Sequence, residues 1–457
     1  MQQPDKFKDY AALVCGQLRW KKARPVVERE IETHLRDQCD ALVQSGMDAE
    51  KAVDESIRQM GDAVEIGTSL DRVHRPKPSW GLLILTVILL AAGLAIQRFV
   101  IHDAHILPRY TLSVVLGVCF FLGAYFMDFT LLGKWPLAFY IGALVLIGGV
   151  VLSDPRSYFA AQLTLLLPLV YAALLYGLRS KRYLGLILAF AGLAIQCVCC
   201  CTIPSMAGLL VTAVVGIALL AAAAWVDWFK IGRARSCVIL AALILPCGTA
   251  LFFHLANAGY FTNRILIMLH PETDPFGAGW EAVQIRNVLA GAQMVGTGTV
   301  PSETYDYYVP FLPRLDRLLT CLIYDYGWIS LILVLAIYAV FFTVALHKCR
   351  KQKNILGRLV SLAVILTLAF QVLFYVCFNL GISLFGVFPL PLVSYGNTAL
   401  VVDLALIGVM LSAFRTGALV RDGDQPLRGR AKPFRWADRV RWKDGVLTIS
   451  FKKDLAS

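Results

Sequence analysis

The chain of 457 residues is 58% hydrophobic and only 16% charged. A soluble protein carries about 25% charged residues, so this composition excludes an ordinary soluble enzyme and indicates a polytopic membrane protein. The net charge of +12 does not indicate nucleic-acid binding. The basic residues gather at the two ends and in alternate loops, as positive-inside topology requires, and they form no stripe interleaved with aromatic residues.

Residues 1–78 have the pattern of a soluble helical domain. Apolar residues recur at helical spacing on an otherwise charged segment: Val27, Ile31, Leu35, Cys39 and Leu42. Gly46 ends this helix, and Asp48 is placed to cap a second one. The pattern EIETHLRDQCDAL…GMDAEKAVDESIRQMGD resembles the short cytosolic prefix domain of several bacterial permease-type proteins, so we expect a regulatory or docking role.

Residues 79–416 form the expected membrane domain, an all-α polytopic fold with ten transmembrane helices. Its apolar segments approach the ~20 residues that cross a bilayer. They lie near 80–101, 110–129, 135–152, 159–177, 183–200, 206–226, 236–256, 318–346, 356–380 and 392–414. Basic residues favour the loops that are cytoplasmic when the amino terminus is inside, so we expect both termini in the cytoplasm.

Two polar segments follow from this arrangement of spans. The outer loop 257–317 exceeds the ~12–15 residues beyond which loops are usually functional or disordered, and we expect it to be functional. The tail 417–457 is basic, which suits it to anionic lipid headgroups or to a docking partner. Alternating residues around Asp444-Gly445 predict a β-hairpin in this tail.

The stretch FPLPLVSYGN, residues 388–397, places two prolines and several polar residues inside an apolar run. Proline removes a backbone donor and breaks helices. At membrane depth, irregular backbone persists only where protein or a water-filled cavity satisfies its polar groups. The stretch is therefore either a loop at the membrane surface or the wall of a cavity.

Three stretches together carry a family resemblance. They are NRILIMLHPETDPFGAGWEAVQIRNVLAGAQMVGTG, VPFLPRLDRLLTCLIYDYGW and FNLGISLFGVFPLPLVSYGNTALVVDLALIGVMLS. They resemble the SEDS family (shape, elongation, division and sporulation) over about residues 80–415. The resemblance implies that the protein polymerises lipid II, an undecaprenyl-linked disaccharide-pentapeptide, at the outer face of the bacterial cytoplasmic membrane. It also implies a transpeptidase partner of the class B penicillin-binding type.

The resemblance assigns a catalytic aspartate eleven residues before the glycine that opens the next span, which makes it Asp316. A carboxylate at the lipid–water boundary acts in glycosyl transfer as general base or positions the nucleophile. A solvated aspartate at a helix start is the alternative. The resemblance also implies a set of substrate-binding residues: Arg264, Gln284, Asn379, Ser394, Tyr395, Gly396 and Asn397. It favours a cavity wall for residues 388–397.

Two further acids are candidates. Asp325 stands where the family usually has glutamate. Asp403 lies inside the last span, where an ionised carboxylate costs at least ~2.5 kcal/mol and is a functional candidate by default. The alternatives are that it is protonated, or paired with Asn379 or Gln371 across the bundle.

The cysteine cluster Cys197–Cys201 either packs a helix end or serves a metal or a disulfide. No cofactor is indicated, and a divalent cation at the site is left open.

The chain departs from the family pattern in its first half, where Gly-Ala-x-Arg-Trp and Gln-Pro-Ser-Glu are missing, and at Arg314, where glutamate is usual. Two other classes of function therefore stay open. One is a non-catalytic membrane scaffold or regulator of cell-envelope assembly. The other is a transporter of a lipid-linked precursor, for which Asp403 is the relevant residue.

Overall fold

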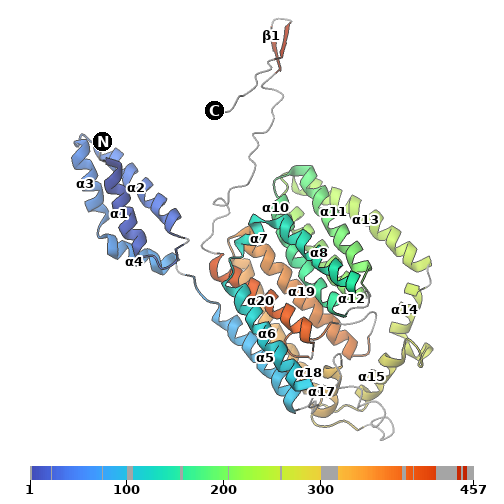
Figure 1. The fold of residues 1–457 in the computed structure, drawn as a ribbon. Coiled ribbons are helices and arrows are strands. Elements are labelled where there is room, and N and C mark those ends of the chain that lie inside the picture. Colours follow the sequence, from blue (N-terminus) through green and yellow to red (C-terminus); the bar gives the residue numbers. More distant parts are fainter. Residues whose placement is uncertain are drawn as a thin grey trace. The chain divides into compact units, whose positions relative to one another are not determined.

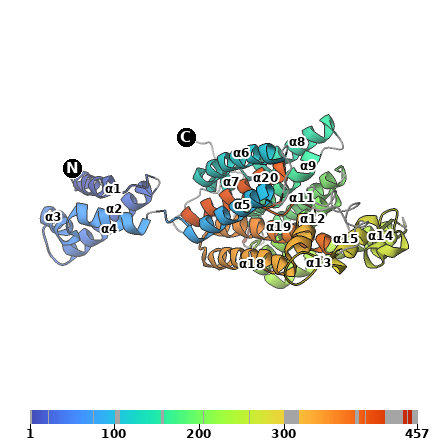
Figure 2. The same ribbon diagram turned by 90° about the horizontal axis from the view of Figure 1, so that it is seen from below.

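The computed structural model describes residues 3–21, 23–74, 76–99, 106–154, 158–203, 205–257, 260–299, 317–382, 388–394, 396–417, 440–443 and 446–449. Apart from one short hairpin, the regular elements in these ranges are helices (Figures 1 and 2). The predicted all-α polytopic membrane fold is confirmed.

The amino-terminal segment folds into four helices: α1 Gln3–Gly16, α2 Arg24–Gln44, α3 Ala49–Met60 and α4 Ala63–His74. Their apolar faces form a hydrophobic cluster of their own, to which the predicted stripe contributes Val27, Ile31 and Leu35. The predicted cap is confirmed, because the Asp48 carboxylate accepts from the Glu50 backbone N–H at 3.2 Å. The domain boundary expected at residue 78 stays a prediction.

Nine helical segments among the described residues are long and apolar enough to cross a membrane. They are α5 Trp80–Phe99, α6 Ile106–Phe126, α8 Pro136–Ser153, the segment α9 Tyr158–Leu163, η1 Thr164–Leu166 and α10 Leu167–Leu178, then α11 Arg182–Cys201, α12 Met206–Trp225, α18 Trp328–Lys351, α19 Ile355–Asn379 and α20 Asn397–Thr416. The expected span at 236–256 coincides with α13, Arg233–Asn257, which holds Pro246 and is not one of these nine. The count of ten stays a prediction.

Two expected spans begin later than the hydropathy suggested. The segment 318–346 is broken into α17, Leu318–Tyr326, and the spanning helix α18. Gly327 causes the break with a φ of +92°, and a Cβ there would lie 2.5 Å from the Met294 carbonyl oxygen. The last span begins at Asn397 rather than near 392, because residues 388–394 are not helical.

The predicted outer loop contains regular structure. It holds α14 Tyr260–Leu269, the 3₁₀ turn η2 Pro271–Thr273 and α15 Trp280–Ala290. Figure 1 shows α15 and α17 at the same end of the helical bundle, and the two helices pack against each other.

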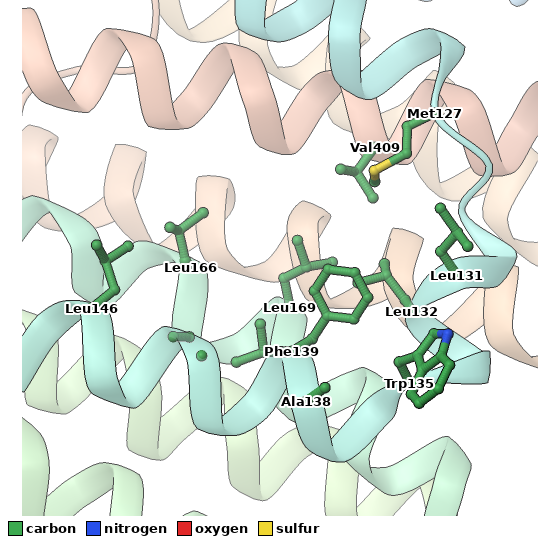
Figure 3. A pocket seen from close by; sticks show the side chains of 13 residues that line it. Met127, Leu131, Leu132, Trp135, Ala138, Phe139, Leu146, Leu166, Leu169 and Val409 are labelled. Atoms are coloured by element: carbon green, nitrogen blue, oxygen red, sulfur yellow. The ribbon is translucent and has the colours of Figure 1, made fainter.

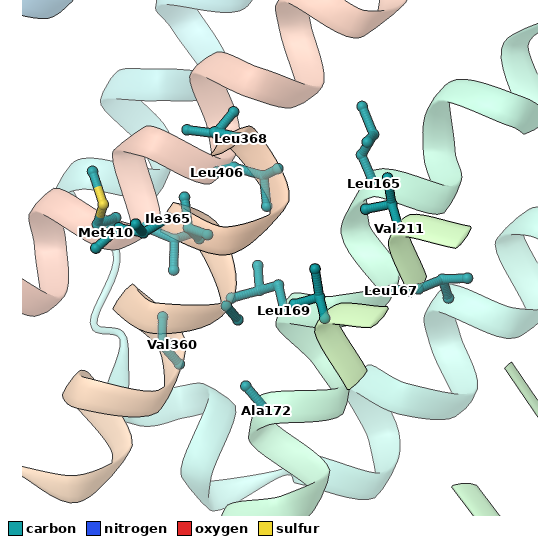
Figure 4. Packing of buried hydrophobic residues seen from close by; sticks show 14 of the residues in the cluster. Leu165, Leu167, Leu169, Ala172, Val211, Val360, Ile365, Leu368, Leu406 and Met410 are labelled. Carbon is teal, nitrogen blue, oxygen red and sulfur yellow. The ribbon is translucent and has the colours of Figure 1, made fainter. Parts of the chain in front are cut away.

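Helix α10 lies at the centre of the membrane domain. It packs on α8, α11, α12 and α19, and nearly every residue of it is buried. In Figure 4, Leu169 and Ala172 of α10 lie opposite Val360 and Ile365 of α19, with Met410 of α20 beside them. A helix that is apolar all round is buried in this way, whereas α8 leaves most of its surface for lipid.

The short helix α7, Thr130–Lys134, joins α6 to α8. In the tail, which forms a separate unit, β1 Val440–Lys443 pairs antiparallel with β2 Val446–Ile449. The predicted hairpin is confirmed, with Lys443 opposite Val446 across the two-residue connection.

The non-helical segment 388–394 is buried, and side chains from three helices satisfy its carbonyl groups. Gln371 of α19 donates to the Pro389 carbonyl at 3.0 Å. Tyr338 of α18 donates to the Pro391 carbonyl. Tyr110 of α6 donates to the Leu392 carbonyl at 3.1 Å. The stretch is therefore no surface loop, because its backbone is buried and bonded to protein.

Gly93 of α5 allows this segment to pack closely. A Cβ on Gly93 would lie 2.5 Å from both the Leu392 carbonyl oxygen and the Tyr110 hydroxyl. We expect Gly93→Ala to destabilise the protein by about 1–3 kcal/mol, as overpacking does. The matched control is Gly149→Ala in α8, where no atom lies within 4 Å of the new Cβ. Thermal melting in detergent tests this, and equal melting temperatures for the two variants would contradict it.

Candidate functional site

The outer-loop motif DPFGAGW forms a compact turn around Asp274. Its carboxylate accepts from the Ala278 N–H at 2.8 Å, and its carbonyl accepts from the Gly279 N–H at 3.1 Å. A Cβ on Gly277 would lie 2.4 Å from the Asp274 carboxylate, and one on Gly279 would lie 2.3 Å from the Pro271 carbonyl. The spacing of aspartate and glycines is thus explained by the turn, which leads directly into α15.

Arg286 of α15 ties this turn to its surroundings. Its guanidinium donates to the Met268 carbonyl of α14 at 3.2 Å and to Glu272 of η2 at 3.4 Å. It also donates to the Gly381 carbonyl, just beyond α19, at 3.3 Å. One cation therefore connects the outer loop to the end of a spanning helix.

Residues 291–299 attach the loop to the α17–α18 junction through backbone hydrogen bonds. The Gly298 N–H donates to the Tyr324 carbonyl at 2.7 Å, and the Trp328 N–H donates to the Gln293 carbonyl at 3.0 Å. A Cβ on Gly298 would lie 2.8 Å from the Tyr324 ring. Gly298 therefore allows a close approach, whereas Gly296 adopts a positive φ of +95° that favours glycine.

The start of α17 is held from two sides. Arg317 forms a part-buried ion pair with Glu281 of α15. Thr320 donates its backbone N–H and its hydroxyl to the Asn379 side-chain carbonyl, each at 3.0 Å. Asn379 in turn donates to the Tyr375 carbonyl at 2.9 Å. This anchors the chain immediately after position 316; Asp316 itself lies outside the described residues.

The other predicted substrate-binding residues lie at several places. Arg264 is half-buried on α14, and Gln284 is buried on α15 with no hydrogen-bond partner for its Oε1 among the described residues. The Ser394 hydroxyl is buried and donates to the Leu390 carbonyl at 3.4 Å. Tyr395 lies outside the described residues.

Gly396 precedes α20, and Asn397 is the first residue of that helix. A Cβ on Gly396 would lie 2.5 Å from the Pro389 ring. The requirement for glycine at this position is therefore steric. Asn379 is bonded to α17, and Gln284 lies on α15 within the loop. Ser394 ends the buried segment 388–394, and Gly396 lies just before α20.

The two additional acids have different environments. Asp325 is half-buried in the last turn of α17, outside the nine spanning segments, and burial raises the pKa of its carboxyl. Asp403 is 1% exposed in the middle of α20 and accepts from Gln371 at 3.2 Å. The predicted pairing of Asp403 with Gln371 is confirmed, and Asn379 is instead bonded to Thr320.

Sequence reasoning missed three residues that build the site: Glu281, Arg286 and Thr320. Glu281 and Arg286 are charged residues in a helix of an otherwise apolar domain, and this pattern could have identified them from the sequence. Thr320 carries none, because a threonine in a short apolar helix is common and its partner lies 59 positions away.

The described residues contain no group of three or more His, Cys, Asp or Glu side chains placed to hold a metal ion. In the cysteine cluster, Cys200 is buried with its sulfur 3.7 Å from the Thr212 hydroxyl, and the cysteines that the structure describes are free thiols.

A separate groove of about 540 Å³ opens between α7, α8 and α10. Its walls are apolar side chains such as Phe139, Leu169 and Val409 (Figure 3). It holds no group that could carry acid–base chemistry.

The fold and site define a polytopic α-helical membrane protein in which the segment holding α14 and α15 contacts the α17–α18 junction and the chain just beyond α19. The model of the cell cycle protein family named for FtsW, RodA and SpoVE matches residues 78–417. The chain belongs to this family.

Curated relatives and solved structures agree with this assignment. The peptidoglycan glycosyltransferase MrdB of Escherichia coli K12 is 30% identical over 193 residues, which cover 41% of this chain and 48% of MrdB. The stage V sporulation protein E of Bacillus subtilis is 26% identical over 159 residues, covering 35% of this chain and 43% of that protein. The chain thus spans about half the length of the curated relatives it matches.

Among solved structures, a chain of a peptidoglycan synthase complex superimposes with a TM-score of 0.56 at 21% identity, covering 74% of this chain and 98% of that one. The rod shape determining protein RodA of Thermus thermophilus superimposes with a TM-score of 0.50 at 17% identity, covering 74% and 97%. At these identities the likeness concerns the fold.

We expect Asn379→Ala to destabilise the protein by about 1–3 kcal/mol, because it leaves the buried backbone N–H of Thr320 unsatisfied. Thr320→Val removes the hydroxyl from the same contact, and the double variant tests the coupling by thermal melting. The two effects should be less than additive. Full additivity would show that the two side chains do not depend on each other.

The raised pKa of Asp325 gives a pH-dependent effect. A buried acid whose folded-state pKa is raised lowers the stability of the fold as pH rises through that pKa. We expect Asp325→Asn to raise the melting temperature at neutral pH, with the gain shrinking toward about pH 4, near the pKa of a free aspartate. The exposed Asp37→Asn is the control, and an unchanged or lower melting temperature at neutral pH for Asp325→Asn would refute the expectation.

Proposed function

We propose that the protein is a peptidoglycan glycosyltransferase that polymerises lipid II at the outer face of the cytoplasmic membrane. Family membership over residues 78–417 supports this, as do relatives named as peptidoglycan glycosyltransferases. The reaction joins a sugar hydroxyl to an anomeric carbon and releases a lipid pyrophosphate.

The observation that carries the proposal is the anchoring of the start of α17. Arg317 is bound to Glu281, and Thr320 is bound to Asn379, within four residues of Asp316 in the chain. A catalytic group must be held in place by its neighbours, because a misplacement of about 1 Å can cost about 100-fold in rate. The contacts are of the kind that would fix a carboxylate at position 316.

In this proposal Asp316 acts as general base toward the attacking sugar hydroxyl or positions it. Arg264 and Gln284 supply polar groups on the outer-loop side. Ser394, Gly396 and Asn397 are proposed to belong to the wall of the site, beside the bonded backbone of residues 388–394, and Tyr395 joins them on the family resemblance alone.

The orientation of the bundle supports an outer position for the site. Helix α18 ends in Lys348, Arg350 and Lys351, which favours the cytoplasm for the connection between α18 and α19. The opposite end of α19, at Asn379, would then face the outside, and both termini would be cytoplasmic.

A transpeptidase partner of the class B penicillin-binding type belongs to the proposal. It is supported by the structural likeness to a chain of a peptidoglycan synthase complex, whose published description concerns the coordination of polymerization and crosslinking.

The test is lipid II polymerisation by the purified full-length protein, with and without a co-expressed transpeptidase. We expect glycan strands from the wild type and a loss of about 100-fold or more for Asp316→Ala, the range for a removed general base. The matched control is Asp306→Ala, which removes another carboxylate from the same loop.

Strands from wild type and Asp316→Ala alike would retain the polymerase and reject the role of Asp316. No strands from folded wild type under either condition would reject the proposed activity and favour a non-catalytic scaffold.

A further inference from the structure

Asp403 and Gln371 form a buried polar pair between α20 and α19. Asp403 is 1% exposed and Gln371 is fully buried. The Gln371 amide nitrogen donates to one carboxyl oxygen of Asp403, Oδ2, at 3.2 Å, and to the Pro389 carbonyl at 3.0 Å. One side chain therefore joins two helices and the non-helical segment.

Two oxygens of this pair lack a donor among the described residues: Asp403 Oδ1 and Gln371 Oε1. The orientation of the glutamine amide is fixed, because its nitrogen faces two acceptors and a flipped amide would place oxygen against oxygen. A buried acceptor without a donor is unfavourable, and an ionised carboxylate in a membrane span is more so. A hydrogen-bond donor or a cation is therefore needed beside Asp403 Oδ1 and Gln371 Oε1.

The neighbouring side chains do not supply that group. Among the described residues, Asp403 forms no ion pair, and its polar contact is with Gln371. Tyr338 lies within electrostatic range of Asp403, Tyr110 and Tyr375. The hydroxyl protons of Tyr338 and Tyr110 are donated to the Pro391 and Leu392 carbonyls. Asp403 Oδ1 accepts no hydrogen bond from any side chain among the described residues.

We propose that Asp403 is protonated in the folded protein and donates its Oδ1 hydrogen to Gln371 Oε1. Carboxyl and amide then form a neutral pair joined by two hydrogen bonds, N–H to Oδ2 and O–H to Oε1. One proton then satisfies both oxygens that otherwise lack a partner, Asp403 Oδ1 and Gln371 Oε1, and the pair carries no net charge.

This pair positions the segment that leads into α20. Gln371 holds the Pro389 carbonyl, and the Pro389 ring packs on Gly396, where α20 is about to begin. Asp403 is thus a positioning residue for the 388–397 segment. Its effect on catalysis rests on the proposed function, whereas the protonated pair itself does not.

The test compares two substitutions at one position. Asparagine offers an amide N–H donor and a carbonyl acceptor in the shape of a protonated aspartate, and leucine offers neither. We expect Asp403→Asn to match the wild type in melting temperature and in strand synthesis. Asp403→Leu should melt at a clearly lower temperature and lose about tenfold or more in synthesis, because it removes both hydrogen bonds of the pair.

Infrared spectroscopy of the full-length protein in detergent reports protonation directly. The wild type minus Asp403→Asn difference should contain a carboxylic-acid C=O band at neutral pH. Ser361→Ala is the control, since it removes another buried hydroxyl of α19 that has no partner among the described residues, and it should leave that band unchanged.

Two results would overturn the proposal. One is a carboxylate band in place of the acid band. The other is an Asp403→Asn variant as unstable as Asp403→Leu together with a wild-type melting temperature that rises with Na⁺ or K⁺, which would indicate a bound cation. Melting and infrared data do not depend on polymerase activity, so loss of the proposed function would leave this test intact.

Discussion

The structure depends on satisfying the backbone of residues 388–394 inside the membrane domain. A carbonyl group without a donor is too costly in an apolar interior, so an irregular segment can persist there only if side chains reach it. Gln371, Tyr338 and Tyr110 do so from three different helices. The same contacts connect α6, α18 and α19 to one segment, which leads into α20.

The outer loop is attached to this framework by few but specific contacts. Arg286 binds the Gly381 carbonyl 95 positions away, and Asn379 binds Thr320 across 59 positions. Each contact involves a buried or part-buried polar group whose loss leaves a partner unsatisfied. The described part of the loop therefore behaves as part of the fold, since it is bonded to the start of α17 and to the chain just beyond α19.

Much of the fold could be predicted because hydropathy and capping are local properties. Nine of the expected spans, the Asp48 cap and the tail hairpin are confirmed. The break at Gly327 was missed, since its cause is the Met294 carbonyl beside it, which belongs to a distant part of the chain. The predicted site, including the catalytic role of Asp316, stays a prediction; of the alternatives considered for Asp403, the structure shows the contact with Gln371.

The sequence by itself determined the membrane class, because that rests on composition and hydrophobic periodicity, and its motifs indicated the family whose model matches residues 78–417. Only the tertiary structure decided which side chain serves which buried group. Asn379 could have paired with Asp403, but packing places it against Thr320 and leaves Gln371 for the acid. Partners distant in the chain are selected by helix packing, which sequence spacing does not encode.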